Sequence, residues 1–385
     1  MPIEPYAFLE ALQRSVYESL GRAPVVASPD ALRSIAEATT RSMNPQASAE
    51  EVAQAVERMV ERARQDAARV PTPYEDPGWY GILSGFAESI ERSVEQMGMS
   101  LPRRPAFGSL PTGQVNAMTI AVPGGSDHLI VFDHQMFLFA LLLSKAVARA
   151  FPVDSGPGGI RISMSQDDIR ARVDSEPSVL ERFADVVHAY AVWGQPGQAR
   201  QYHAEPLYVN IADSIRVSME AFALGHEYGH VIAGHLRSAG RVARMLPNEQ
   251  VQEVDYDWQQ EYEADHLGVA LSMTALHRDR RYDLTQSFWG ADLFFSAMDI
   301  MDRAVSLLRY GDENAQTLGS HPPSTARRGV LRGVLRTLVD GPPAEQAISA
   351  AQTLEFVAEL LWERTRPLLA RAGSGGRTAA TTWRG

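Results

Sequence analysis

Apolar residues recur at three- and four-residue spacing along most of the chain, with polar residues between them. This period places the apolar side chains on one face of a helix, so it predicts helices that cover a hydrophobic core. The ranges with this pattern are 4–20, 47–70, 79–99, 179–193, 214–238, 258–273, 284–310 and 344–371. A further helix, over 136–151, is apolar on nearly all sides and is therefore predicted to be buried.

Two apolar stretches indicate strands instead. Residues 114–122 and 128–133 flank a Pro-Gly-Gly-Ser-Asp turn, and this arrangement predicts a β-hairpin. Residues 208–211 indicate a short strand or an entry loop, and 241–257 indicate a connecting loop with an acidic end. The expected fold class is therefore mainly α (α+β), with a small β-hairpin.

Changes in composition divide the chain into four parts. We expect an N-terminal helical region over 1–105, a central domain over 106–340, a C-terminal helix over 341–372 and a disordered tail over 373–385. A Gly- and Pro-rich stretch opens an insertion in the central domain at about 152–207. This insertion is expected to hold a lid or an inserted hairpin.

The net charge and the absence of cysteine argue against several classes of function and site. The 385 residues carry a formal net charge of −11, which argues against non-specific nucleic-acid binding. Because there is no cysteine, disulfides, thiol nucleophiles and cysteine-ligated zinc are excluded. The start of the chain lacks a basic region followed by an apolar run, and Lys145 interrupts the most apolar segment before it reaches membrane-spanning length. We therefore expect a cytoplasmic protein without a membrane span.

The strongest chemical signal is His226-Glu227-x-x-His230, within the helix predicted over 214–238. Residues four apart leave a helix on the same face, so both imidazoles can bind one metal ion. Two neutral histidine nitrogens fit adjacent corners of a zinc tetrahedron. Glu227 lies beside them, where its carboxylate can hold a metal-bound water without binding the metal itself.

A third histidine, His235, follows His230 by five residues. A metzincin site needs a spacing of six and a glycine turn before its third histidine. Because the helix is predicted to continue to residue 238, His235 is expected about 140° around it from His230. We therefore expect His235 to pack or hydrogen-bond on the opposite side rather than to bind the metal.

A catalytic zinc site needs a third protein ligand from another element. Glu261 and Asp265 lie four apart on the next predicted helix and share a face. We expect Glu261 to be the third ligand and Asp265 to accept a hydrogen bond from one zinc-bound histidine. Glu263 lies about 200° around the helix from Glu261 and should face elsewhere. The alternative is an acidic helix face in contact with solvent.

The ordered set of motifs resembles the gluzincin zinc metallopeptidases. It is similar to the branch that holds the CAAX prenyl protease, the heat-shock protease HtpX and the mitochondrial inner-membrane stress proteases. Four segments carry this resemblance: Asn116-Ala117 in a strand, His226-Glu227-x-x-His230 followed by His235, Glu261-x-x-x-Asp265, and His321-Pro-x-x-x-x-Arg327. They cover about residues 114–332. The chain lacks the membrane helices of that branch.

The resemblance implies a zincin-like metallopeptidase domain with one Zn²⁺ per chain and a small sheet beside the metal helix. It also implies that His321 donates a hydrogen bond to the tetrahedral oxyanion and that Arg327 orients the site. The strand at Asn116 and Ala117 would hold an extended substrate at the sheet edge by β-augmentation.

These residues predict a zinc-dependent endopeptidase that acts on a cytosolic protein or peptide. His226, His230 and Glu261 would hold the zinc, with Glu227 as the general base. One alternative is a helical binding or regulatory protein with a structural or inactive metal site. Another is a zinc hydrolase whose substrate is not a peptide.

Overall fold

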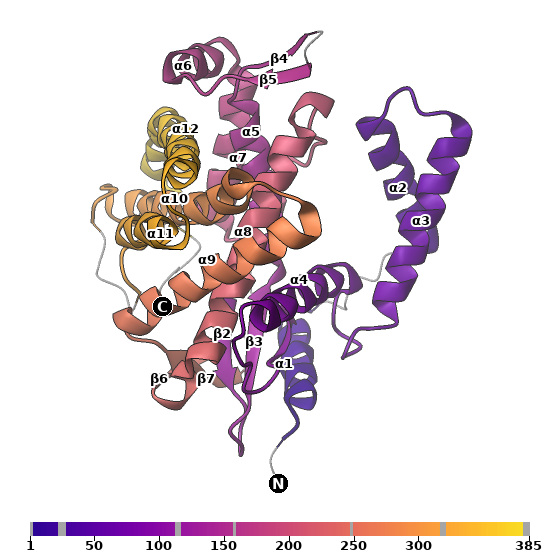
Figure 1. Ribbon diagram of the computed structural model, residues 1–385, viewed down its shortest axis with the longest axis vertical. Coiled ribbons are helices and arrows are strands. Elements are labelled where there is room, and N and C mark those ends of the chain that lie inside the picture. Colours follow the sequence, from indigo (N-terminus) through magenta and orange to yellow (C-terminus); the bar gives the residue numbers. More distant parts are fainter. Residues whose placement is uncertain are drawn as a thin grey trace.

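The computed structural model describes residues 3–21, 28–111, 117–156, 159–246, 249–315 and 321–379 (Figure 1). The fold is mainly α with a small mixed sheet, which confirms the predicted class. The helices are α1 (Pro5–Ser19), α2 (Pro29–Met43), α3 (Ala49–Ala67), α4 (Pro77–Gln96), α5 (His134–Arg149), α6 (Gln166–Ser175), α7 (Pro177–Trp193), α8 (Pro206–Ala233), α9 (Trp258–Arg280), α10 (Leu284–Tyr310), α11 (Ser324–Leu338) and α12 (Pro342–Ser374). The strands are β1 (Ala106–Leu110), β2 (Ala117–Ala121), β3 (His128–Asp133), β4 (Val153–Gly156), β5 (Gly159–Ile162), β6 (Gly240–Leu246) and β7 (Glu249–Asp255).

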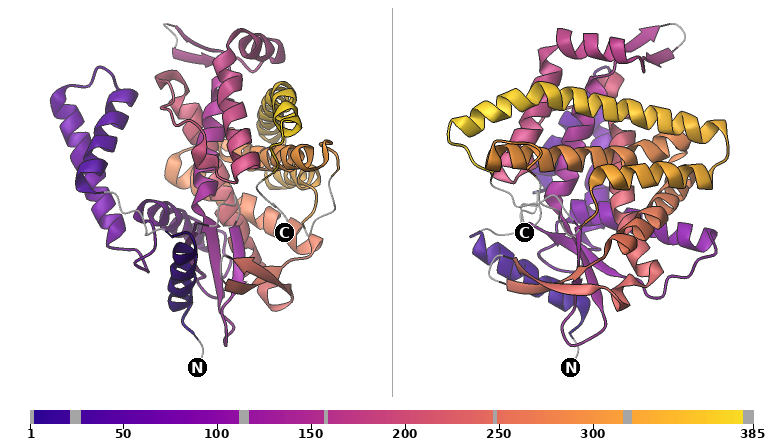
Figure 2. Two further views of the ribbon diagram at one scale, coloured as in Figure 1. Left: turned by 180° about the vertical axis from the view of Figure 1, so that it is seen from behind. Right: turned by 90° about the vertical axis from the view of Figure 1, so that its left-hand side faces the viewer.

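Helix α8 forms the centre of the molecule. It packs against α5, α9 and α10, and α12 lies alongside α10 (Figure 2). Large side chains from these helices and from α7 fill the core, including Phe183, Phe222, Phe288 and Trp362. Burying such aromatic area is the main stabilising contribution to the core. No helix among the described residues combines the length and apolar character that a membrane crossing needs.

Polar side chains fix where two of the central helices begin. Asp257 and Gln260 form a capping box at the start of α9, and Asp283 and Gln286 form one at the start of α10. In each box the two side chains accept hydrogen bonds from two backbone N–H groups that would otherwise lack a partner at the start of the helix. Because the first box defines the opening turn of α9, it also fixes the position of Glu261 within that turn.

The main sheet has the strand order β1-β3-β2-β7-β6. Strands β2 and β3 are antiparallel, which confirms the predicted hairpin over its described residues, while positions 114–116 of the predicted first strand lie outside the described part. Strand β1 pairs in parallel with β3 and was not predicted. The connecting loop predicted over 241–257 is wrong, because β6 and β7 form an antiparallel hairpin there. Most side chains of β6 are exposed, so its sequence lacks the apolar alternation that marks a half-buried strand.

The structure also corrects both ends of the helix that carries the His-Glu-x-x-His motif. Helix α8 begins at Pro206, so the short strand or entry loop predicted over 208–211 is wrong. Proline suits the first helical position, where its missing N–H costs no hydrogen bond. The helix ends at Ala233 rather than continuing to residue 238, because Gly234 takes a left-handed conformation with φ of 75°.

The segment predicted as an insertion, 152–207, contains the β4–β5 hairpin, α6 and α7. The hairpin was among the expected contents, but α7 belongs to the main core, where Phe183 and Tyr190 are fully buried. At the other end of the chain, α12 reaches Ser374, so the tail predicted from residue 373 begins as helix. Residues 380–385 lie outside the described part.

The first hundred residues fall into three packing groups. Helix α4 packs in the main core against α8 and α9. Helix α1 covers the sheet and forms a second hydrophobic cluster with it, centred on Leu9, Ile120 and Val131. Helices α2 and α3 pair with each other around a small cluster that contains Ala36 and Val56. Figure 1 shows this helical pair at the periphery, beside α4.

A buried polar cluster joins α1 to β1 and gives a testable pH effect. Glu75 is buried, and its carboxyl group accepts hydrogen bonds from the Ser109 backbone at 3.0 Å and from Gln13 Nε2 at 2.7 Å. Burial raises the pKa of Glu75 to about 7, although Ser109 and Gln13 act in the opposite direction. The folded chain therefore keeps this proton at pH values where the unfolded chain has lost it.

Stability should consequently fall as the pH rises from about 4.5 to about 7, by about 3 kcal/mol for this group alone. The Glu75→Gln variant lacks the titrating group and should not show this part of the decline. Urea unfolding of both proteins across this pH range measures the difference. A difference in unfolding free energy that is constant with pH would contradict the expectation.

Candidate metal centre

Glycines allow α8 and α9 to approach closely at the metal motif. A Cβ atom at Gly229 would lie 2.7 Å from the carbonyl oxygen of Ala264. A Cβ atom at Gly268 would lie 2.8 Å from the backbone nitrogen of His226. Such separations are too short for a real Cβ atom. The backbones of α8 and α9 can therefore be in contact only because these positions are glycines. This contact brings side chains at the start of α9 over the His-Glu-x-x-His face of α8.

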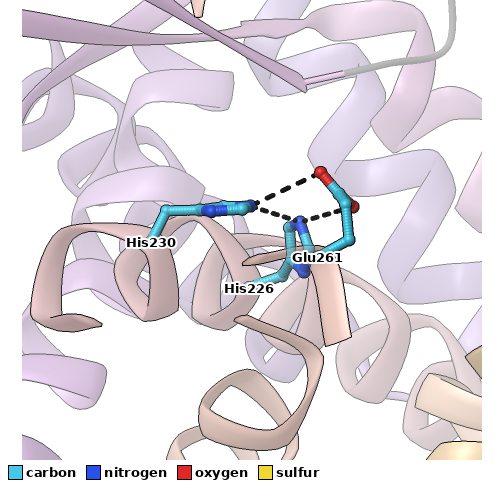
Figure 3. A group of neighbouring side chains, drawn as sticks. All are labelled: His226, His230 and Glu261. Carbon is cyan, nitrogen blue, oxygen red and sulfur yellow. Dashed lines mark hydrogen bonds and ion pairs between the residues drawn. The ribbon is translucent and has the colours of Figure 1, made fainter. Parts of the chain in front are cut away.

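The structure brings His226, His230 and Glu261 together (Figure 3). The Nε2 atoms of His226 and His230 lie 3.1 Å apart. The Glu261 carboxylate oxygens lie 3.7 Å from each of these nitrogens. In a tetrahedral zinc site with bonds of 2.0–2.1 Å, neighbouring donor atoms lie about 3.3–3.4 Å apart. The three donors therefore fit one ion of this size with small adjustments, and two histidines with one carboxylate are a typical catalytic zinc set.

Burial keeps one of these rings neutral. His230 is fully buried, and this burial lowers its pKa far below the ordinary histidine value, with His226 and His235 adding to the effect. A neutral imidazole has the free electron pair that a metal ligand requires. The ring of Tyr256 stacks on His230, with centroids 3.5 Å apart and an interplanar angle of 14°.

A buried ion pair between Asp265 and Arg327 contacts His226 and Glu261. Asp265 Oδ1 lies 2.9 Å from Nδ1 of His226, so the two groups are within hydrogen-bonding distance. Arg327 makes a two-point contact with Asp265, at 2.6 and 2.7 Å, and its Nη1 lies 3.0 Å from Glu261. Burial would raise the pKa of Asp265, but Arg327 and His226 lower it below its ordinary value. Arg327 thus orients two carboxylates of the site.

Glu227 lies at the site but outside the donor triangle. Its carboxylate accepts a hydrogen bond of 2.9 Å from the hydroxyl of Thr119 on β2. Burial raises the pKa of Glu227 above its ordinary value, while His226 and Thr119 act in the opposite direction. A carboxylate with a raised pKa is better matched to accepting a proton near neutral pH.

His321 lies at the rim of the site. Its side chain is 49% exposed, and its Nε2 lies 3.9 Å from Glu261 Oε1. The loop residues just before it, 316–320, lie outside the described part. The position is suitable for donating a hydrogen bond to a group bound beside the metal site.

A cleft of about 280 Å³ opens beside these residues. Its lining combines apolar and charged side chains. The apolar ones are Met136, Phe222, Phe294, Phe295 and Met298, and the charged ones include Arg244, Glu253, Asp255 and Asp302. His226, Glu227, His321 and Arg327 also line it. A ligand in the cleft would therefore contact the candidate metal centre directly.

Comparisons with protein-family models, curated protein sequences and solved structures found no match. The residues and their geometry therefore carry the functional assignment.

The predicted substrate strand needs correction. Ala117 lines the cleft at the start of β2, and Asn116 lies outside the described residues. Strand β2 is not at the sheet edge, because β3 pairs with one side and β7 contacts the other through Ile120 and Glu253. β-Augmentation needs an unpaired edge, so the prediction that β2 is an edge strand is wrong. The edges of this sheet are β1 and β6.

Sequence reasoning also misplaced or missed three neighbours of the site. His235 does not lie on the opposite side of α8, since its Nδ1 is 2.9 Å from Nδ1 of His230. Gly234 was the available signal, because a glycine there permits the turn that ends the helix. Thr119 reaches the site from β2, and Tyr256 reaches it from the residue that follows β7, through non-local packing that the sequence pattern does not reveal.

The close helix contact predicts a substitution effect. Gly229→Ala places a methyl group against the α9 backbone, so the helices must separate. We expect the free energy of unfolding to fall by about 1–3 kcal/mol and metal affinity to weaken, because Glu261 moves away from His230. Gly333→Ala on α11, with open space around its Cβ position, is the matched control and should be neutral or stabilising. Equal effects of both substitutions on metal affinity would contradict this account.

Proposed function

We propose that the chain is a zinc-dependent endopeptidase that cleaves a protein or peptide substrate in the cytoplasm. The observation that carries the proposal is the triangle of His226, His230 and Glu261, with Glu227 beside it and an open cleft in front. The resemblance of the motif set to gluzincins supports the same assignment. Zinc is the favoured ion, since histidine nitrogens with one carboxylate suit it better than Mg²⁺ or Ca²⁺.

His226, His230 and Glu261 would hold the zinc ion, which would supply a positive charge that makes a neighbouring water easier to deprotonate near neutral pH. Glu227 accepts a proton from the attacking water and then donates it to the leaving amine. His321 donates a hydrogen bond to the negative oxygen that develops on the scissile carbonyl. Arg327 and Asp265 hold Glu261 and His226 in place throughout.

The apolar side chains that line the cleft can exclude water from the reacting groups, which strengthens electrostatic interactions there. Its mixed lining also suits a polypeptide, which presents apolar side chains and a polar backbone together. Structural zinc normally has four protein ligands and no open coordination position, so a site that opens into a cleft is more typical of a catalytic metal.

Digestion of an unbiased peptide mixture tests the proposal. The zinc-loaded protein should generate new peptide termini with a consistent residue preference around the cleaved bond. Protein treated with a chelator should generate none, and zinc should restore cleavage. Tightly bound zinc with no cleavage of any peptide would instead favour a binding protein or a hydrolase of another substrate class.

A further inference from the structure

Hydrogen bonds lead from the candidate metal ligand His230 to the surface of the protein. Nδ1 of His230 lies 2.9 Å from Nδ1 of His235, and Nε2 of His235 lies 3.1 Å from Oε2 of Glu263. Both histidine side chains are buried, whereas the Glu263 side chain is 54% exposed. We propose that His235 and Glu263 form a relay that sets the tautomer and orientation of His230 as a metal ligand. This inference rests on the proposed metal site but not on peptide cleavage.

The proton positions follow from the donor and acceptor rules. Nε2 of His230 belongs to the donor triangle, so it must keep a free electron pair there. The single proton of the neutral ring is then on Nδ1 and is donated to Nδ1 of His235. Because that nitrogen accepts, the proton of His235 is on Nε2 and is donated to Glu263. A doubly protonated His235 would point one N–H group at another and break the chain of contacts.

The fold holds His235 for this contact. Gly234, with φ of 75°, ends α8 and lets the next residue turn back toward His230. The short 3₁₀ turn His235–Arg237 follows. The hydroxyl of Ser238 accepts a hydrogen bond of 3.0 Å from Gln260 Nε2, which ties this turn to the start of α9. The turn is therefore fixed against the same helix that carries Glu261 and Glu263.

The two histidine ligands are thus oriented by different groups. His226 faces a carboxylate, Asp265, which Arg327 holds in place. His230 faces the neutral imidazole of His235. An imidazole accepts a hydrogen bond less strongly than a carboxylate does, unless its other nitrogen donates a hydrogen bond to a carboxylate. Glu263 occupies that position. Partners of this kind typically change metal affinity by about 10- to 100-fold when they are removed.

Zinc affinity, measured by competition with a chromophoric chelator, tests the relay in the full chain. His235→Phe retains a ring of similar size but removes the acceptor, and it should weaken zinc binding by about 10- to 100-fold. His235→Asn places a carbonyl oxygen near the position of Nδ1 and should restore most of the affinity. Urea unfolding of the zinc-free proteins shows whether both variants remain folded.

Zinc affinity of His235→Phe equal to that of the unsubstituted protein would overturn the relay. An Asn variant that binds as weakly as the Phe variant would also overturn it, because the role would then be one of packing. The proposed peptidase fails separately, if the unsubstituted protein binds zinc but cleaves no peptide. If the unsubstituted protein binds no zinc, both proposals fail.

Discussion

Glu227→Gln is expected to lower kcat/KM for peptide cleavage by about 10²- to 10⁴-fold while zinc remains bound. The amide has nearly the size of the carboxylate, and its carbonyl oxygen can still accept the hydrogen bond from Thr119. It cannot accept a proton from the attacking water. The ligands His226, His230 and Glu261 are unchanged, so the effect falls on the chemical step.

The measurement joins steady-state kinetics on a cleaved peptide with zinc analysis of the same samples. Glu249→Gln is the matched control, because Glu249 is exposed on β7 and lies outside the site. It should cleave at the normal rate. Normal cleavage by Glu227→Gln would assign the general base to another residue.

Glu261→Ala is expected to abolish tight zinc binding. Loss of a partner that merely orients a ligand costs about 10- to 100-fold in affinity, so loss of a ligand should cost more than about 100-fold. Cleavage at limiting zinc should disappear with the metal. Arg327 keeps its two contacts with Asp265, so the helix contact around them should persist.

Chelator competition gives the affinity, and circular dichroism shows whether the helices are retained. Glu249→Ala serves as the control for removing a glutamate side chain and should bind zinc normally. If Glu261→Ala bound zinc as tightly as the unsubstituted protein, the third ligand would have to be a different residue.

The sequence predicts those features of the site that depend only on the spacing of residues along a single helix. The spacing of His226 and His230 fixes both rings on one face of α8, and Glu261 and Asp265 share a face of α9 in the same way. Whether these faces meet depends on the close backbone contact at Gly229 and Gly268. The sequence does not indicate this role for either glycine, because a glycine within a predicted helix does not by itself predict a contact with another helix.

The features that could not be predicted arise from contacts between distant segments. The β6–β7 hairpin is mostly exposed and leaves little apolar alternation to detect. Its pairing through Ile120 and Glu253 turns β2 into an internal strand. The position of His235 depends on the conformation of one residue, Gly234, and a longer helix would have carried its ring away from His230.

Metal content, combined with X-ray absorption at the metal edge, shows whether His226, His230 and Glu261 bind a zinc ion. We expect one zinc ion per chain, bound by two histidine nitrogens, one carboxylate and an exchangeable water. Replacing His230 by alanine should remove the ion. A purified protein that binds no zinc, or a site closed by four protein ligands, would contradict the account.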